Sequence, residues 1–445
     1  MQMASATQDN IEAVVIGKVT RRLFPFMIIL TMVNFIDRVN IGYAALTMNK
    51  DLGIDPSAFG LAAGIFFLGY VLFEVPSNVI LHRVGANIWL ARIMLTWGAV
   101  VTAMAFVNGV TGLYVMRFLL GVAEAGFIPG ITFYILLWVP LSQRARLTAM
   151  WILATPFAGI VGGPLAGLLL QLDGALGFKG WQWLFIAEGI PAMLLAVATY
   201  FYLTPVPAKA NWLTDGERQW LQGKLAAEDA KIHADTRQKF SLGAALLNWR
   251  VLVLGLLYIG MNMGLSGINN WMPTIIKSLG TLSNLEVSCV SAIPWICGAF
   301  AAILWGRHSD RTNERYVNLA IPLIVGAAGF AASAYVGSPL LGIVCLSVAV
   351  MGVIAGYTVF WVVPGTFLTG VAVAGGIALV NSMGNLGGFI APFAIGWIKQ
   401  ATGSFTDALL VLAGAMVLSA VIAFLIRPAR PDATLGAQST QPVQG

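Results

Sequence analysis

The chain has 445 residues and a formal net charge of +6, and 58% of its residues are hydrophobic whereas only 10% are charged. Soluble domains carry about 25% charged residues, so this composition excludes an ordinary soluble fold. The apolar residues form runs of about twenty residues rich in Leu, Ala, Ile and Gly, which is the pattern of membrane-spanning helices. A β-barrel would instead show shorter segments of alternating polarity.

Three cysteines, Cys289, Cys297 and Cys345, lie in apolar runs, and their spacing fits neither a disulfide framework nor a metal site. The three histidines lie in predicted loops. We therefore expect no metal, no cofactor and no enzyme active site. The polar segment 1–18 has no apolar core followed by a cleavage site, so we interpret it as a cytoplasmic tail.

Taken in chain order, twelve apolar runs predict twelve transmembrane helices in two bundles of six, an all-α membrane fold. The N-terminal bundle with its tail covers residues 1–204, a cytoplasmic linker covers 205–248, and the C-terminal bundle with its tail covers 249–445. In the linker, Thr214 and Glu217 have the spacing of a helix-capping box. The predicted spans are 23–46, 59–81, 88–107, 113–139, 147–172, 183–203, 251–279, 287–305, 316–335, 340–363, 367–398 and 408–426.

Lysine and arginine are distributed unevenly between the two sides of the predicted membrane. On the side of the N-terminus lie 19 of the 25, four lie on the opposite side, and Arg38 and Arg117 lie inside helices. Because cytoplasmic loops are enriched in these residues, we expect both termini in the cytoplasm of a multi-pass protein of the cell inner (plasma) membrane. The same bias explains the basic character of the chain without a nucleic-acid partner.

A faint internal repeat supports the division into two halves. The segment 306–315 after the eighth predicted helix reads G-x-x-x-D-R-x-x-x-R, with Gly306, Asp310, Arg311 and Arg315. Shifted back by 228 residues, Arg311 falls on Arg83, while the other key positions differ. Two similar halves in parallel with a site between them is a known plan of transporters.

This loop resembles the signature loop of the major facilitator superfamily, and further stretches resemble the anion:cation symporter branch of that superfamily. The branch includes bacterial permeases for tartrate, aldonates, hexuronates, glucarate and phthalate. The resemblance implies a twelve-helix fold, transport by alternating access, a conformational role for the two loops, and a monomer. The stretches that carry it are Asn34–Asn40 (NFIDRVN), Tyr70–Asn78 (YVLFEVPSN), Arg117–Gly126 (RFLLGVAEAG) and Asn381–Gly388 (NSMGNLGG).

Four ionisable residues fall well inside predicted helices, where each costs about 2.5–3.5 kcal/mol on insertion scales. Asp37 and Arg38 are adjacent and point about 100° apart, whereas Arg117 and Glu124 share a face about two turns apart. We therefore expect Asp37 to pair with Arg117 across the first and fourth helices, which leaves Arg38 and Glu124 free to face a cavity. Permanent ion pairs that only hold helices together are the alternative interpretation.

The residue chemistry suggests a role for each charge. A guanidinium stays charged when desolvated and binds a carboxylate through two parallel hydrogen bonds, so Arg38 is the candidate ligand of a substrate carboxylate. Burial disfavours the ionised form of a carboxyl group, so Glu124 is the candidate proton carrier. Asp37 is the second candidate, because loosening of its expected contact with Arg117 would couple protonation to helix movement.

Three further polar residues lie in the first half. The family resemblance makes Tyr70 a hydroxyl donor to the substrate. Glu74 lies one turn further along the same helix, and we interpret it as structural, with hydrogen bonds near Ser77. Glu188, in the predicted sixth helix, is also interpreted as structural.

The second half lacks charges inside its predicted helices and offers neutral polar groups instead. Asn262 and Asn269 form a stripe with Ser266 at helical spacing, and Asn381 and Asn385 form another. We expect these asparagines to bind substrate hydroxyls or a second carboxylate, although the glycines beside Asn385 could equally serve helix packing.

Moving one negative charge into a cell costs about 2.3 kcal/mol per 100 mV, so an anion importer needs a coupled cation. We expect proton-coupled import of a small organic anion, a hydroxy-carboxylate such as tartrate or a sugar acid. Uptake of an aromatic carboxylate is an alternative, as is exchange or export, because the glycine-rich run 159–167 resembles one found in antiporters. A membrane enzyme, a channel and a sensor that binds without transport are the other classes considered.

Overall fold

The computed structural model describes residues 2–235, 248–312, 314–366 and 371–427, and the regular structure in these ranges is entirely helical, as predicted. The first group of helices comprises α1 (Gln2–Asp51), α2 (Pro56–Val84), α3 (Ala86–Met104), α4 (Gly109–Glu124), α5 (Phe127–Trp138), α6 (Leu141–Ile152), α7 (Ala154–Leu170) and α8 (Gly180–Tyr202). After α9 (Asp215–Asp235), the second group comprises α11 (Trp249–Ser278), α12 (Asn284–Val290), α13 (Ala292–Thr312), α14 (Arg315–Ser333), α15 (Pro339–Phe360), α16 (Val371–Thr402) and α17 (Thr406–Leu425).

Within the described ranges, 11 helices or joined helix pairs are long and apolar enough to cross a membrane. The 50-residue α1 is not among them, although it contains the first predicted span after a polar stretch. Together with α1, these segments follow the predicted spans in chain order. The predicted start of the eleventh span at residue 367 lies outside the described residues, and α16 begins at Val371.

Three predicted spans are broken where continuous helices were expected. Each break comes three or four residues before a proline: α4 and α5 separate before Pro129, α6 and α7 before Pro156, and α12 and α13 before Pro294. Proline has no N–H to bond the carbonyl four residues back, and its ring clashes with that carbonyl. At the first break the freed carbonyl of Ala125 accepts a hydrogen bond from Ser77 Oγ on α2 at 2.7 Å. The break is therefore a stabilised feature of the fold.

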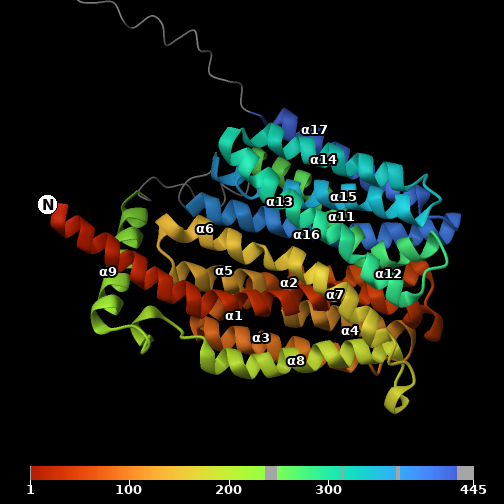
Figure 1. Ribbon diagram of the computed structural model, residues 1–445, viewed down its shortest axis with the longest axis horizontal. Helices are drawn as coiled ribbons and strands as arrows, with labels where there is room; N and C mark the ends of the chain where they lie inside the picture. The colour runs from red at the N-terminus through yellow and green to blue at the C-terminus, as the bar shows by residue number, and fades with distance from the viewer. Residues whose placement is uncertain (1, 236–247, 313, 367–370, 428–445) are drawn as a thin grey trace, which may run out of the picture.

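The helices form two groups that lie one above the other in Figure 1. In the first group α3 packs along α8 and α2 along α4, and in the second α14 packs along α15 and α17. Three helices of the first group reach the second: α2 packs along α16, α1 along α11, and α7 against α12 and α13. The interface between the groups therefore consists of α1, α2 and α7 on one side and α11, α12, α13 and α16 on the other.

The two groups are in contact at the end of the molecule near α12, which lies opposite α9 in Figure 1. Near the start of α2, a Cβ on Gly60 would lie 2.3 Å from the backbone oxygen of Pro392 on α16, so only glycine fits there. Near the end of α1, a Cβ on Gly42 would lie 2.8 Å from the backbone oxygen of Asn269 on α11. The backbones of the two groups thus touch directly at the end that we call the α12 end.

The segment after α8 folds back on the first part of α1 at the opposite end, the α9 end. The predicted capping box is formed, since Thr214 N donates to Glu217 Oε2 at 2.9 Å and Glu217 N donates to Thr214 Oγ1 at 3.3 Å. The carboxylate of Glu217 also accepts from Lys18 Nζ of α1 at 2.7 Å. The ring of Trp212 stacks on Trp138 with centroids 5.3 Å apart. These contacts attach the beginning of the connection between the two groups to α1 and α5.

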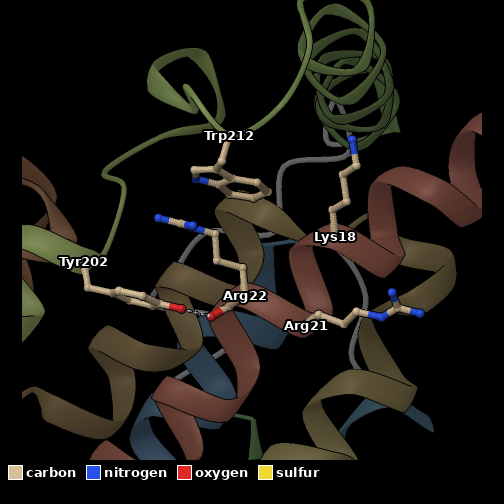
Figure 2. A pocket seen from close by; sticks show the side chains of 5 residues that line it. All are labelled: Lys18, Arg21, Arg22, Tyr202 and Trp212. Carbon is tan, nitrogen blue, oxygen red and sulfur yellow. Dashed lines mark hydrogen bonds between the residues drawn. The ribbon is translucent and has the colours of Figure 1, made fainter.

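A surface pocket of about 430 Å³ lies at this attachment, lined by Lys18, Arg21, Arg22, Tyr202 and Trp212 (Figure 2). The guanidinium carbon of Arg22 lies 5.1 Å from the ring centre of Tyr202 and 5.3 Å from that of Trp212. In Figure 2, Lys18 points towards α9, while Arg21 points away from both rings. The cationic side chains therefore do not point towards a common centre where a ligand could bind. We assign this pocket to the attachment of the connecting segment.

Candidate functional site

An ion pair in the middle of the first group joins α1 to the end of α4. Arg38 Nε lies 2.7 Å from Glu124 Oε1, and Asn34, one turn earlier on α1, donates to the same oxygen. The side chain of Glu124 is 2% exposed and that of Arg38 is 18% exposed. The carboxylate of Glu124 is thus enclosed by donors from α1, while the guanidinium of Arg38 stays partly accessible.

Aromatic rings surround the guanidinium of Arg38. Its carbon lies 5.0 Å from the ring centre of Tyr70, 5.4 Å from that of Phe66 and 5.6 Å from that of Phe35. Such rings attract a cation through their negative faces while excluding water. The Nη2 atom of Arg38 is buried and has no hydrogen-bond partner. The guanidinium therefore keeps one donor available for a second anion while it holds Glu124.

The expected pairing of charges is wrong in two respects. Arg38 and Glu124, expected to be free, bind each other, and Asp37 and Arg117, expected to pair, are not among the ion pairs of the described residues. The reason lies in the close packing of α4 on α2, where a Cβ on Gly121 would lie 2.0 Å from a backbone oxygen of α2. Arg117 lies one turn before Gly121 on the same face, so it faces α2 and not α1.

Arg117 is held by backbone groups and a ring. Its Nε and Nη2 atoms lie 3.4 Å and 3.5 Å from the backbone oxygens of Ala62 and Ala63, and its guanidinium carbon lies 5.1 Å from the ring centre of Phe66. It also lies within electrostatic range of Glu124. The single carboxylate Glu124 thus faces two arginines, one at hydrogen-bonding distance and one further away.

Asp37 belongs to a second acidic site between α1, α3 and α8. Trp97 Nε1 donates to Asp37 Oδ2 at 2.5 Å, and Asn40 Nδ2 donates to Glu188 Oε2 at 2.7 Å. Asp37 and Asn40 are three residues apart on one face of α1, so both carboxyl groups lie along that face, close enough to repel each other. The second oxygens, Asp37 Oδ1 and Glu188 Oε1, are buried without partners. Asp37 and Glu188 therefore form a buried acid pair without a bonded cation among the described residues.

Glu188 was interpreted as structural, and its proximity to Asp37 was missed. The signal in the sequence was that Glu188 is an isolated acid within an apolar run. Local spacing could not show that it lies against α1, because its hydrogen-bond donor on α1, Asn40, is 148 positions away. With Glu74, the first group buries four acids, whereas the arginines inside its predicted helices are Arg38 and Arg117, so these six residues carry a formal charge of 2 − 4 = −2 if every group is ionised. The charges of the four residues Asp37, Arg38, Arg117 and Glu124 sum to zero. The excess negative charge therefore comes from Glu74 and Glu188.

Glu74 joins the two groups of helices. Asn381 Nδ2 on α16 donates to Glu74 Oε1 on α2 at 2.9 Å. The interpretation of Glu74 as a partner of residues near Ser77 is wrong, because Ser77 bonds the freed carbonyl of Ala125 instead. Asn381 thus lies at the interface between the groups, as its expected role requires. Within electrostatic range of Glu74 lie Arg38 and Tyr70.

The predicted polar stripe of α11 is largely engaged in holding α16. Asn262 Nδ2 donates to the backbone oxygen of Gly384 at 2.7 Å, and Asn262 Oδ1 accepts from Tyr357 at 2.9 Å. Ser266 Oγ donates to the backbone oxygen of Gly388 at 3.1 Å. Asn262 is therefore engaged through both of its polar side-chain atoms in this conformation, in contacts with α15 and α16.

Three asparagines of the second group keep free polar atoms. Two of them, Asn269 and Asn385, are predicted substrate ligands, and the third is Asn270, whose Oδ1 is unpaired. Asn269 Oδ1 on α11 and Asn385 Nδ2 on α16 are both buried without a hydrogen-bond partner. Asn385 lies one turn beyond Asn381, which reaches Glu74. The assignment of Asn262, Asn269, Asn381 and Asn385 as substrate ligands stays a prediction. Of these residues, Asn262 is bonded through both of its polar side-chain atoms.

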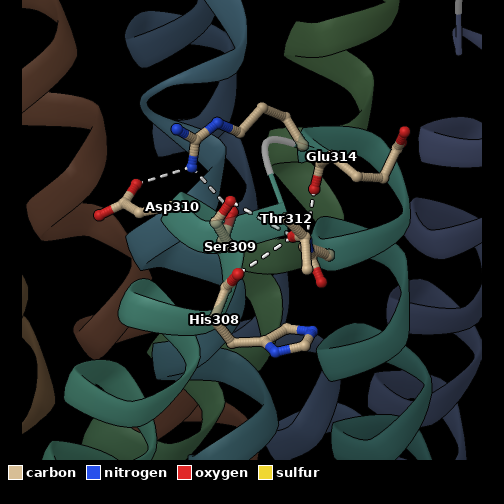
Figure 3. A network of polar contacts seen from close by, with 7 residues as sticks. His308, Ser309, Asp310, Thr312 and Glu314 are labelled. Carbon is tan, nitrogen blue, oxygen red and sulfur yellow. Dashed lines mark hydrogen bonds and ion pairs between the residues drawn. The ribbon is translucent and has the colours of Figure 1, made fainter.

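The loop between α13 and α14 forms a network of polar contacts (Figure 3). Arg315 Nη1 donates to Asp310 Oδ1 and to Ser309 Oγ, both at 2.9 Å, and Arg427 Nη2 lies 3.3 Å from Glu314 Oε2. Arg311 is exposed, as is Arg83 at the end of α2. A Cβ on Gly306 would lie 3.2 Å from Thr358 on α15. The signature segment thus links α13, α14 and the end of α17.

The arrangement of long apolar helices around partly paired buried charges is that of a membrane transporter. The model of the Major Facilitator Superfamily matches residues 27–375, which is more than half of the chain. The chain belongs to this superfamily, and the resemblance seen in its sequence is confirmed.

Relatives extend over nearly the full length. The chain is 46% identical to a "putative tartrate transporter" of Agrobacterium vitis over 425 residues, 96% of this chain and 94% of the relative. It is 42% identical to a quinolone resistance transporter of Acinetobacter baumannii over 98% of both chains. It is 38% identical to the inner membrane transport protein RhmT of Escherichia coli, over 93% of this chain and 95% of the relative. These relatives and the fold are those of membrane transporters and not of enzymes.

Solved structures share the fold at low identity. A D-xylose–proton symporter covers 92% of this chain and 98% of its own with a TM-score of 0.71 and 14% identity. A bacterial homologue of the human lysosomal transporter Spinster, in an inward-facing and occupied conformation, has a TM-score of 0.70 and 16% identity and covers 91% of this chain and 96% of its own.

Proposed function

We propose that this protein imports a hydroxylated organic anion, such as tartrate or a sugar acid, together with protons by alternating access. The observation that carries the proposal is the guanidinium of Arg38, which holds Glu124 through Nε and keeps Nη2 without a partner. A guanidinium presents several donors in a fixed plane. It can therefore exchange its bond to Glu124 for bonds to a substrate carboxylate.

Coupling follows from the balance of charge. When a substrate carboxylate takes the place of Glu124 on Arg38, Glu124 loses its closest cation in a buried site. An unpaired buried carboxylate is unstable and favours protonation. Anion binding and proton binding at this site therefore support each other. The tartrate transporter name of the 46% relative supports the substrate class.

The orientation completes the proposal. We place both termini in the cytoplasm of an inner membrane, following the distribution of lysine and arginine. The α12 end, where the glycine contacts hold the two groups together, is then the outer side, and this conformation is closed there. The halves 1–204 and 249–445 rock against each other while 205–248 connects them. The loops with Arg83 and with Gly306, Asp310, Arg311 and Arg315 would stabilise the conformation closed at the cytoplasmic side, in a monomer.

The test is uptake of labelled tartrate by purified protein in liposomes. We expect accumulation when the outside is acidic, little accumulation without a proton gradient, and loss of uptake in Arg38→Ala. Equal accumulation with and without the gradient would contradict the proposed proton coupling. Uptake that survives Arg38→Ala would contradict the proposed role of Arg38 as the anion site.

Transport of an aromatic carboxylate, by uptake or export, is a second candidate. It is favoured by a cluster of aromatic rings around Tyr258. The ring centroids of Tyr357, Phe360 and Trp361 lie 4.7 to 5.6 Å from that of Tyr258. The relative that confers quinolone resistance points the same way. In the same liposomes, competition of tartrate uptake by phthalate or a quinolone would support it, and absence of competition at saturating concentration would oppose it.

A further inference from the structure

Glu74 carries a buried oxygen without a partner at the interface between the two groups of helices. Its residue is 6% exposed, and Oε1 is occupied by the hydrogen bond from Asn381 Nδ2 at 2.9 Å. The other oxygen, Oε2, has no hydrogen-bond partner. Leaving a buried polar atom unpaired destabilises the protein, and more so if the atom is charged. A ligand that supplies a donor to Oε2 would remove this destabilisation.

The charged and polar groups around Glu74 come from four helices. Arg38 of α1 and Tyr70 of α2 lie within electrostatic range, as does Tyr258 of α11, while Asn381 of α16 is bonded directly. No lysine or arginine in the described part of the chain forms an ion pair with Glu74. Its carboxyl group is therefore held by an amide, and Arg38 acts on it electrostatically without a bond to Oε2.

Two unpaired atoms of opposite character lie on either side of Tyr70 in the chain of contacts. Tyr70 is one turn before Glu74 on α2, and its ring centre lies 5.0 Å from the guanidinium carbon of Arg38. Arg38 Nη2 is a donor without an acceptor, and Glu74 Oε2 is an acceptor without a donor. A carboxylate group satisfies the first, and a hydroxyl group satisfies the second. A hydroxy acid carries both on neighbouring carbons. An acid of the same size without the hydroxyl would satisfy Arg38 and leave Glu74 Oε2 buried and unpaired.

We propose that Glu74 is a specificity-determining residue that accepts a hydrogen bond from the substrate hydroxyl while Arg38 holds the substrate carboxylate. This inference rests on the proposed transport of an organic anion. It identifies Glu74 as the residue that makes the transporter prefer hydroxylated acids. Because Glu74 also bonds Asn381 of the second group, the hydroxyl is bound at the contact between the two moving halves. A site built to bond a hydroxyl rejects the analogue that lacks it.

The experiment compares three four-carbon dicarboxylates with two, one and no hydroxyls, namely tartrate, malate and succinate. Their affinities for the purified full-length protein are measured by isothermal titration calorimetry. We expect wild-type protein to prefer tartrate to succinate by about tenfold to a hundredfold, from the strength of one hydrogen bond to a charged group. In Glu74→Met, which keeps the length but removes the acceptor, we expect this preference to fall at least tenfold through weaker tartrate binding.

The matched control is Val75→Met, which introduces the same side chain at the next residue, whose side chain is 64% exposed on the outside of α2. It should keep the wild-type preference. Equal weakening of tartrate and succinate in Glu74→Met would overturn the inference and leave Glu74 a packing residue. Wild-type protein that binds none of the three acids would overturn the proposed function itself, which distinguishes the two failures.

A second test needs no variant and covers the case in which Glu74→Met does not fold. The ligand 2,3-difluorosuccinate resembles tartrate in size but has no hydroxyl donor. We expect it to bind wild-type protein as weakly as succinate. If it binds as tightly as tartrate, the hydroxyl does not donate to Glu74 and the inference is wrong.

Discussion

The buried acids of the first group differ in what surrounds them. Glu124 accepts from Arg38 and Asn34, so its negative charge is compensated where it lies. Asp37 and Glu188 accept only from Trp97 and Asn40, which are neutral donors. Two like charges in a medium of low dielectric cannot both persist without a cation. The pair should therefore hold a proton in the folded protein, whereas the charge of Glu124 is compensated by Arg38.

This difference predicts an effect of pH on stability. Between pH 5 and pH 8 the unfolded chain has both acids ionised, so the folded pair binds more protons and wild-type stability falls as pH rises. In the variant Glu188→Gln a neutral amide replaces the carboxyl group, so no proton has to be bound at this position. We expect its melting temperature in detergent to exceed that of wild type at pH 8 by several degrees, with the gap closing towards pH 5. A gap that is constant with pH, or a variant less stable at pH 8, would contradict the shared proton.

At the scale of the helix, prolines and glycines decide where the site lies. Pro129 ends α4 so that Glu124 lies in its last turn, opposite Arg38, and Ser77 satisfies the freed carbonyl. On α2 and α16 the close approach at Gly60 closes the α12 end. These helices thus determine both the position of the acid and the conformation that surrounds it.

Enlarging Gly60 should therefore shift the balance between conformations. In Gly60→Ala the new Cβ would meet the Pro392 oxygen at 2.3 Å, which is possible only if α2 and α16 separate. We expect labelling of Asn269→Cys, at the same end, by a membrane-impermeant maleimide to rise at least threefold, and tartrate uptake to slow. The matched control is Gly414→Ala, where nothing lies within 4 Å. Unchanged labelling in Gly60→Ala would show that this contact does not close the α12 end.

At the scale of the whole molecule, the connection between the halves is attached at its first part. Lys18 bonds Glu217, and the rings of Tyr202 and Trp212 lie on either side of Arg22. The hydrogen bonds from Lys18 and from the backbone of Thr214 lower the pKa of Glu217. A lowered pKa in the folded state means that the stabilisation is present above the ordinary value, about 4.3, and is lost as pH falls through the lowered value. The attachment should therefore be constant between pH 5 and pH 8.

Removing this carboxylate should loosen α9 at neutral pH. An ion pair at the protein surface contributes up to about 1 kcal/mol, and this pair is partly buried, with the side chain of Glu217 11% exposed. We therefore expect Glu217→Gln to raise amide hydrogen exchange in α9 by about twofold to fivefold at pH 7. Asp215→Asn is the matched control, because Asp215 is an exposed acid of the same helix that pairs with Arg218 and not with α1. Equal exchange in Glu217→Gln and Asp215→Asn would show that the contact with Lys18 does not hold the connection.

Much of this protein could be predicted from local patterns. Apolar runs of sufficient length predict helices wherever they occur, because the backbone must satisfy its own hydrogen bonds in lipid. The resemblance of short stretches to the major facilitator superfamily was confirmed by the family match over residues 27–375. The prediction that Arg38 and Glu124 are functional followed from the cost of burying charge, which does not depend on the partner.

The partners themselves were decided by tertiary structure. Helical spacing says which residues share a face, but not which helix that face meets, so Arg38 was left free and Arg117 was assigned to Asp37. The contact of Glu74 with Asn381 spans 307 positions and exists only because glycines let α2 and α16 pack closely. The sequence by itself determined a membrane-embedded transporter that carries charged residues inside its helices. It could do so because the cost of burying a charge depends on the residue itself and not on the helix that it meets. Which charges meet depends on how helices pack, and only the folded arrangement contains that information.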